Sequence, residues 1–290
     1  VLGEREFTLT DEEVSVRKNF HYHKLRGHGD GYEIWLKESL QKFVVNRLPD
    51  DAKYLAFLDT DITFQRRDWV EACIDMLQVY PVGQPFASAI DTDPNQNPIP
   101  DEYGNLMDRS FSKAWTEGAI VVDEENVGFG ETSLDWMKSP EGSYDHRAHP
   151  GYAWIITREV WEAIGGFPDW IVLGSADYVI AQIFAGRDWK SEVYTSPGCV
   201  RRLEKFAKKC DEHVRQGIGV VEGIITHGFH GLKTKRHYIT RNDIVHEAGF
   251  DPDKDLDYDR NGIVRLTSDN RKLRDGARRL SMVRDEDSCI

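Results

Sequence analysis

Short apolar segments at strand and helix spacing alternate along the chain. The run 54–58 is apolar on both faces and is bounded by turn residues, which predicts a buried central strand. Apolar residues near helical spacing in 32–47 predict a helix that ends before Pro49. Further strands are predicted at 2–9, 85–90, 151–156 and 220–225, and further helices from residue 10, at 69–79, 158–164 and 177–184, and from residue 271.

Strands that alternate with helices predict an α/β fold, with a mostly parallel, Rossmann-like sheet flanked by helices. We expect one domain over residues 1–290. The segment 91–147 is polar and weakly periodic, which is uncommon for a loop of this length, and is predicted to be an insertion that carries substrate contacts, a lid or both. The segment 226–290 is predicted to form a closing loop and a C-terminal tail.

The formal net charge is −13, and it is unevenly distributed along the chain. Residues 91–145 hold 13 acidic and 3 basic side chains, whereas residues 201–241 hold 10 basic and 4 acidic ones. The acidic balance argues against wholesale non-specific binding of nucleic acid, and an anion is expected to dock on the C-terminal half. The alternative is that both segments are solvated faces.

Two further features of composition concern the compartment. No run of about 18 apolar residues is present, which predicts no membrane span. The cysteines have no CxxC spacing, which argues against a disulfide framework and a zinc ribbon and favours a reducing cytoplasm. These cysteines are Cys73, Cys199, Cys210 and Cys289.

A pair of carboxylates, Asp59 and Asp61, follows the apolar run 54–58. In open α/β sheets, ligands bind at the carboxyl ends of strands. Two nearby carboxylates repel each other, so a divalent cation such as Mg²⁺ or Mn²⁺ is their natural partner, above all when a diphosphate completes its coordination. The alternative is an ordinary Asp-rich turn.

Two histidines, His227 and His230, follow the predicted strand 220–225, and imidazole is a ligand for Mn²⁺. A basic run, 233–241, comes next and could close over phosphates. Alternatively, the histidine pair is structural or solvated.

Asp177 stands at the start of a predicted helix, after the Gly165–Gly166 pair that ends the preceding one. It is either an N-cap or a carboxylate that acts as general base. A separate segment, 257–262, fits the opening of a calcium loop, but its twelfth position is Ser268 instead of Glu, so a turn is favoured.

Taken in order, these motifs resemble a nucleotide-sugar-dependent glycosyltransferase of the GT-A fold. The motifs are LDTD (58–61), GYAWIITREVWEAIGGF (151–167), GSAD (174–177) and HGFHG (227–231). More narrowly, the chain resembles a bacterial and phage group of small glycosyltransferase-like proteins. Members usually open with a strand and an Asn-Pro-containing loop before the position of Leu2, which normally hold much of the nucleoside pocket, so the residues that recognise the base of the donor are not predicted.

The resemblance implies a role for each matching residue. Asp59 and Asp61 would hold Mn²⁺ or Mg²⁺, and His230 or His227 would complete the coordination. Asp177 would be the catalytic base, although Ser175 and Ala176 before it depart from the usual Glu-Asp pair. The donor and substrate would contact Lys37, Asp59, Trp154, Gly174, Arg236, Tyr238 and Arg241.

The implied reaction moves a hexosyl or pentosyl group from a nucleotide sugar, with a UDP-sugar expected, to a hydroxyl acceptor. The phage relatives make a hydroxymethylated base in DNA one of the open acceptors, and the protein would then act in the host cytoplasm. Two alternatives remain: a metal-dependent nucleotidyl or phosphoryl transferase, which also uses paired Asp and a cation, and a non-catalytic, sugar-binding GT-A relative.

Overall fold

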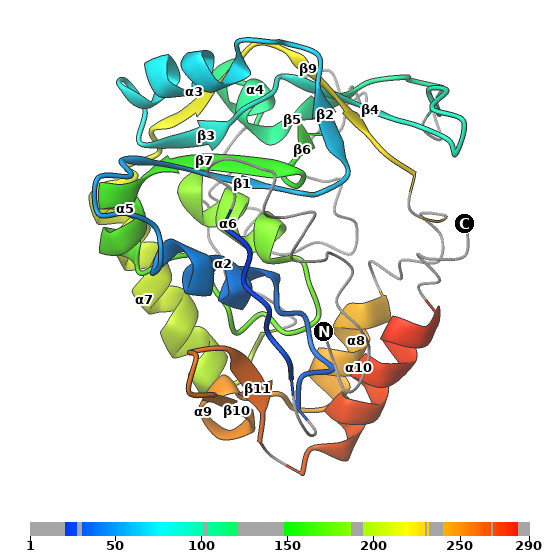
Figure 1. The fold of residues 1–290 in the computed structure, drawn as a ribbon. Helices are drawn as coiled ribbons and strands as arrows, with labels where there is room; N and C mark the ends of the chain where they lie inside the picture. Colours follow the sequence, from blue (N-terminus) through cyan, green and yellow to red (C-terminus); the bar gives the residue numbers. More distant parts are fainter. Residues whose placement is uncertain are drawn as a thin grey trace.

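Two mixed β-sheets lie in the upper half of the described structure as drawn in Figure 1. The computed structural model describes residues 21–27, 31–100, 104–120, 148–186, 194–229, 231, 240–267 and 269–283. In spatial order, the four-stranded sheet consists of β1 (Tyr54–Leu58), β7 (Ala153–Thr157), β3 (Val82–Gln84) and β8 (Ile218–Val220). The five-stranded sheet consists of β2 (Ile62–Phe64), β9 (Ile224–His227), β4 (Ser88–Asp91), β5 (Asp108–Ser110) and β6 (Ala148–His149).

Helices cover both faces of the four-stranded sheet. The described helices are α2 (Lys37–Val45), α3 (Trp69–Leu77), α4 (Phe111–Thr116), α5 (Arg158–Ile164), α6 (Ala176–Phe184), α7 (Pro197–His213), α8 (Thr240–Glu247), α9 (Pro252–Asp255) and α10 (Arg271–Val283). The last three lie away from the sheet, where α8 packs on α10 and α9 on α7. Ile155 of β7 packs against α3, whereas its neighbours Trp154 and Ile156 belong to the large core that includes α5, α6 and α7. This alternation is the expected consequence of the two-residue period of a strand. Figure 1 shows α3 on one side of the sheet and α2, α5, α6 and α7 on the other.

The fold is mixed α/β, and the expectation of a mostly parallel sheet is not met. The strand β7 is antiparallel to both β1 and β3, and β2 is antiparallel to β9. Parallel pairs join β3 to β8, β4 to β9 and β5 to β6. Helix–strand alternation in the sequence therefore identified the α/β class, but it did not reveal the direction of each strand, because direction depends on pairing between distant segments.

Several predicted elements are confirmed by the structure. The strand at 54–58 and the helix at 158–164 have the predicted bounds, and a helix begins at residue 271. The caps explain the bounds of α5, because the Thr157 side chain accepts a hydrogen bond from Val160 N and Gly165 ends the helix in the left-handed conformation (φ 84°). The strand β1 itself lies at an edge of its sheet among the described residues and not at its centre.

Other elements differ from the prediction. The apolar run 220–225 is divided between β8 and β9, which belong to different sheets, and Glu222 and Gly223 lie between them. The predicted helix 32–47 is shorter, since α2 begins at Lys37. The seventeen-residue helix α7 was missed, although Ser196 followed by Pro197 is a typical helix start: the Ser196 side chain accepts a hydrogen bond from Cys199 N at 3.3 Å.

The predicted insertion is partly built into the sheet. Its described residues include β5, which pairs with β4, and α4, which packs on β8 and β6. Residues 101–103 and 121–147 lie outside the described residues, so the predicted lid is not tested. The strand predicted at 2–9 and the helix start at residue 10 also lie outside them.

The calcium-like segment 257–262 forms the turn of a hairpin between β10 (Leu256–Tyr258) and β11 (Val264–Leu266). The Asp259 carboxylate accepts hydrogen bonds from the backbone N–H groups of Asn261 and Ile263 within this turn. The turn interpretation therefore accounts for the motif. In the part of the chain that the structure describes, no helix is both long and apolar enough to cross a membrane.

Candidate functional site

The topology of the five-stranded sheet brings His227 between two aspartates. The strand β9 lies between β2 and β4. His227 ends β9, Asp61 comes just before β2, and Asp91 ends the parallel neighbour β4 directly opposite His227. The Nδ1 atom of His227 lies 2.7 Å from Asp91 Oδ1, and its Nε2 atom lies 3.4 Å from Asp61 Oδ2. The buried imidazole therefore has a carboxylate on each side.

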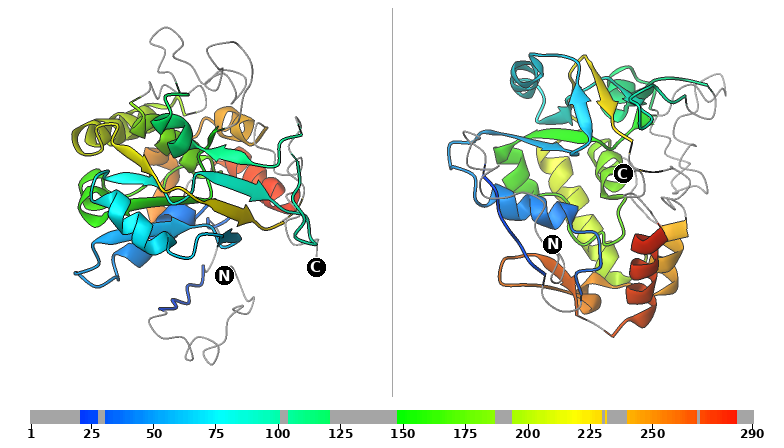
Figure 2. Two further views of the ribbon diagram at one scale, coloured as in Figure 1. Left: turned by 90° about the horizontal axis from the view of Figure 1, so that it is seen from above. Right: turned by 45° about the vertical axis from the view of Figure 1, so that its right-hand side comes forward.

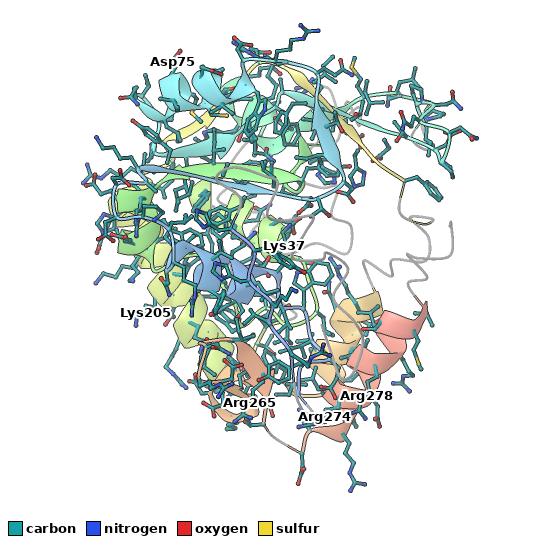
Figure 3. The ribbon with its side chains drawn as sticks, viewed as in Figure 1. Lys37, Asp75, Lys205, Arg265, Arg274 and Arg278 are labelled. Carbon is teal, nitrogen blue, oxygen red and sulfur yellow. The ribbon has the colours of Figure 1, made fainter. Side chains whose placement is uncertain are left out.

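The first aspartate of the pair, Asp59, has a different partner. It follows β1, and its backbone N–H donates to Tyr152 O at 2.8 Å. Its carboxylate forms an ion pair with Lys37, the first residue of α2. Burial would lower the pKa of Lys37, but the charges of Asp59 and Asp177 outweigh this effect and raise it. Lys37 is therefore a cation that faces two carboxylates, and Figure 3 shows it in the middle of the molecule.

Asp177 lines a pocket below the sheet. Ser175 is the N-cap of α6, so Asp177 lies in the first turn of the helix and is not the cap that was the alternative to a base. The empty space of the pocket, part of it open to solvent, is about 300 Å³. The pocket is lined by Lys37, Glu38, Gln41, Phe57, Gly151, Tyr152, Ala153, Trp154, Phe167, Asp177 and Ile180. It thus contains one basic and two acidic side chains, from α2 and α6, beside apolar and aromatic groups.

Gly151 allows two functional groups to approach each other. A Cβ atom on Gly151 would lie 2.8 Å from Asp177 Oδ2 and 2.8 Å from His149 Cε1, closer than real Cβ contacts. The Gly151 N–H donates to His149 Nδ1 at 3.1 Å, so the neutral imidazole of His149 carries its proton on Nε2. His149 also stacks on Tyr152, with a centroid distance of 3.9 Å. The segment 149–152 therefore holds a histidine of defined tautomer beside Asp177.

The residues around His227 provide two ligands suited to a divalent cation. Ligands at adjacent positions around an ion with bonds of about 2.1 Å lie about 3 Å apart, which is comparable with the Asp61–His227 separation. Asp91 on the other imidazole nitrogen is the partner that metal-bound histidines usually have. Within the described ranges, no group of three or more His, Cys, Asp or Glu side chains is arranged to hold a metal ion. The predicted ligand Asp59 faces Lys37 instead, and His230 lies outside the described residues.

Besides Lys37 and Asp59, the predicted donor-binding residues fall into three sets. Trp154 lines the pocket and is anchored by a 2.7 Å hydrogen bond from its Nε1 to Pro150 O. Arg241 is buried and donates to Ser175 Oγ, and a Cβ on Gly174 would lie 2.9 Å from its Nη1. Arg241 therefore supports the turn that leads into α6, and a contact with the donor stays a prediction. Arg236 and Tyr238 lie outside the described residues.

None of the described residues of the basic segment 201–241 lines the pocket. Its described cations lie largely on α7, where Arg201 and Arg202 both pair with Asp253. Figure 3 shows Lys205 at the outer edge of the molecule, away from Lys37. Among the described residues, Lys37 is the basic side chain that lines the pocket. The sequence-based expectation that the site region is basic is thus not supported by these residues.

Four residues of the site were not identified from the sequence: Glu38, Asp91, His149 and Tyr152. Asp91 is the first acidic residue of the predicted insertion. It also follows a predicted strand, as Asp59 does, and this position at a strand end was the signal in the sequence that could have identified it. Tyr152 has a positive φ of 70°, a conformation that is uncommon outside glycine and concentrates at functional sites. The sequence gives no sign of this backbone conformation.

Glu38 is a buried carboxyl group at the pocket. Burial raises its pKa to about 8 from an ordinary value of 4.5, and Lys37 offsets only part of this effect. In the unfolded chain Glu38 ionises near pH 4.5, so between pH 4.5 and 8 the folded protein binds more protons. The free energy of unfolding therefore falls as pH rises from 4.5 to 8. Above this window the full destabilising effect of the ionised Glu38 is present.

Glu38→Gln is expected to remove this pH dependence, because the amide resembles the neutral acid. The variant should match the wild-type melting temperature near pH 5 and exceed it by about 5 °C at pH 8. Thermal melts between pH 5 and 8 measure the effect. Glu71→Gln, at an exposed first-turn position of α3, is the matched control. Parallel pH curves for the Glu38 variant and the wild type would contradict the assignment.

Comparisons of the chain with protein-family models, curated proteins and solved structures found no significant match.

Proposed function

We propose that the protein is a metal-dependent glycosyltransferase of the GT-A type, which moves a sugar from a nucleotide-sugar donor, with UDP as the expected carrier, to a hydroxyl acceptor. The observation that carries the proposal is the convergence of two charged groups of residues. Asp61, His227 and Asp91 form one, and Lys37, Asp59 and Asp177 form the other. Asp59 and Asp61 are two residues apart and belong one to each group.

The residues support a division of labour in this reaction. Asp61 and His227 would hold Mn²⁺ or Mg²⁺, with Asp59 and His230 as further candidates. When bound, the ion would supply positive charge to the departing nucleoside diphosphate. Asp177 would accept the proton of the acceptor hydroxyl while the hydroxyl oxygen forms the new glycosidic bond and the bond to the diphosphate breaks. Lys37 would keep Asp59 oriented and provide a positive charge beside the donor.

A thermal-shift screen of nucleotide sugars, with and without Mn²⁺, tests the proposal. A ligand present at about 100 times its dissociation constant stabilises the native state by about 2.7 kcal/mol, which corresponds to several degrees. We expect one nucleotide sugar to raise the melting temperature, and the rise to require Mn²⁺. No stabilisation by any nucleotide sugar would count against the proposal.

Product analysis separates the competing reactions. A glycosyltransferase releases a nucleoside diphosphate, whereas a nucleotidyl transferase releases pyrophosphate. Stabilisation without turnover of any acceptor would favour a sugar-binding protein. For a DNA acceptor, the affinity should fall steeply with salt, and a flat salt dependence would exclude it.

A further inference from the structure

The two nitrogen atoms of the His227 imidazole have unequal contacts. The Nδ1 atom lies 2.7 Å from Asp91 Oδ1, within the range of a strong hydrogen bond to a carboxylate. The Nε2 atom lies 3.4 Å from Asp61 Oδ2, which is longer than a normal hydrogen bond. The shorter contact favours a proton on Nδ1 that is donated to Asp91, and Nε2 is the nitrogen on the side of Asp61.

Asp91 is itself fixed in place. As the last residue of β4 it lies opposite His227 in the parallel β4–β9 ladder. The Tyr152 hydroxyl donates to the same oxygen, Asp91 Oδ1, at 3.1 Å. The Tyr152 ring also packs on the imidazole of His227, with a centroid distance of 4.5 Å. The Asp91 side chain is only 13% exposed, so its orientation is defined by the protein and not by solvent.

We propose that Asp91 is a positioning residue for metal binding: it holds the tautomer and the orientation of His227 so that Nε2 and the Asp61 carboxylate face one divalent cation. This inference rests on the metal-dependent function proposed above. In known metal sites, a carboxylate on the second nitrogen of a histidine fixes the ring and increases its basicity as a ligand, and losing it costs about 10–100-fold in affinity.

A purely structural role for the pair predicts a different behaviour. In that case His227 is a protonated link that ties β2, β9 and β4 together through Asp61 and Asp91. Removing Asp91 would then lower the stability of the protein, because a buried imidazolium would lose one of its carboxylates. The affinity for a metal ion would not depend on Asp91.

Calorimetric titration of the folded protein with Mn²⁺, alone and with UDP, distinguishes the two roles. We expect Asp91→Asn to weaken Mn²⁺ binding by about 10–100-fold. Tyr152→Phe, which removes the second hydrogen bond to Asp91 and keeps Asp91 itself, should weaken it less. Asp75→Asn, at an exposed position of α3 far from Lys37 in Figure 3, should leave it unchanged. Circular dichroism confirms that each variant is folded.

The possible outcomes separate the inference from the proposed function. If Asp91→Asn binds Mn²⁺ as tightly as the wild type but melts at a lower temperature, the positioning role is overturned and the metal-dependent function is not. If the wild-type protein binds no Mn²⁺, either alone or with UDP, both the inference and the metal-dependent function are overturned. If Asp91→Asn does not fold, Tyr152→Phe decides: unchanged Mn²⁺ affinity rejects the role, and a reduced affinity supports it.

Discussion

Asp61→Ala is expected to lower metal-dependent sugar transfer on the order of 1,000-fold, because a metal centre contributes several kcal/mol to the transition state and each 1.4 kcal/mol is a factor of ten. Asp61 is the carboxylate that lies next to His227, and its side chain is about a third exposed, so the variant should fold. The measurement is the rate of nucleoside diphosphate release at a series of Mn²⁺ concentrations.

Asp59→Ala should also lower transfer strongly, but with a different effect on binding. Asp59 is paired with Lys37, so its loss removes the ion-pair partner of the ammonium group, although Asp177 remains nearby. We therefore expect a larger effect on donor binding than on Mn²⁺ affinity. Asp75→Ala, at the exposed position on α3, is the control for both variants. Activity that survives both the Asp59 and the Asp61 substitutions would refute the site.

Asp177→Asn is expected to reduce kcat by about 100- to 10,000-fold, the usual contribution of a general base, while the stabilisation by the nucleotide sugar is retained. The amide has nearly the same shape as the carboxylate but cannot accept the proton. Parallel measurements of kcat and of the donor-induced thermal shift separate chemistry from binding. Glu159→Gln replaces the exposed first-turn acid of α5 and controls for the effect on a helix N-terminus.

Gly151→Ala tests the role of Asp177 as general base by displacing its side chain. The added methyl group would lie 2.8 Å from both Asp177 Oδ2 and His149 Cε1, so at least one of these side chains must move. A displacement of about 1 Å in a catalytic group can cost about 100-fold in rate. We expect kcat to fall to this extent in the variant. Full activity in both Asp177→Asn and Gly151→Ala would place the base elsewhere.

The proposed reaction depends on contacts between segments far apart in the chain. The group formed by Asp61, Asp91 and His227 joins three strands of one sheet, whereas Lys37 and Asp177 come from α2 and α6. The right-hand view of Figure 2 shows α2, in blue, below the strands. The pair Asp59 and Asp61 lies between β1 of one sheet and β2 of the other, so it connects the two groups. The −13 net charge gives no indication of this arrangement, because a sum over the chain does not report which charged side chains lie together.

The sequence by itself determined the local elements and part of the site. Hydrophobic spacing and capping residues depend on neighbours within a few positions, so β1 and α5 were predicted with their observed bounds. The rule that ligands bind at strand ends identified Asp59, Asp61 and His227. The spacing of Asp59 and Asp61 does not show that Asp59 faces Lys37 whereas Asp61 faces His227.

Only the tertiary structure decided which residues meet. Asp91 and His227 are 136 positions apart in the sequence, and their contact exists because β4 and β9 pair in one particular register. The division of 220–225 between two sheets and the direction of β7 likewise follow from strand pairing. Periodicity reports whether a position is buried, but it contains no information on the partner, because pairing is fixed by the packing of the whole fold.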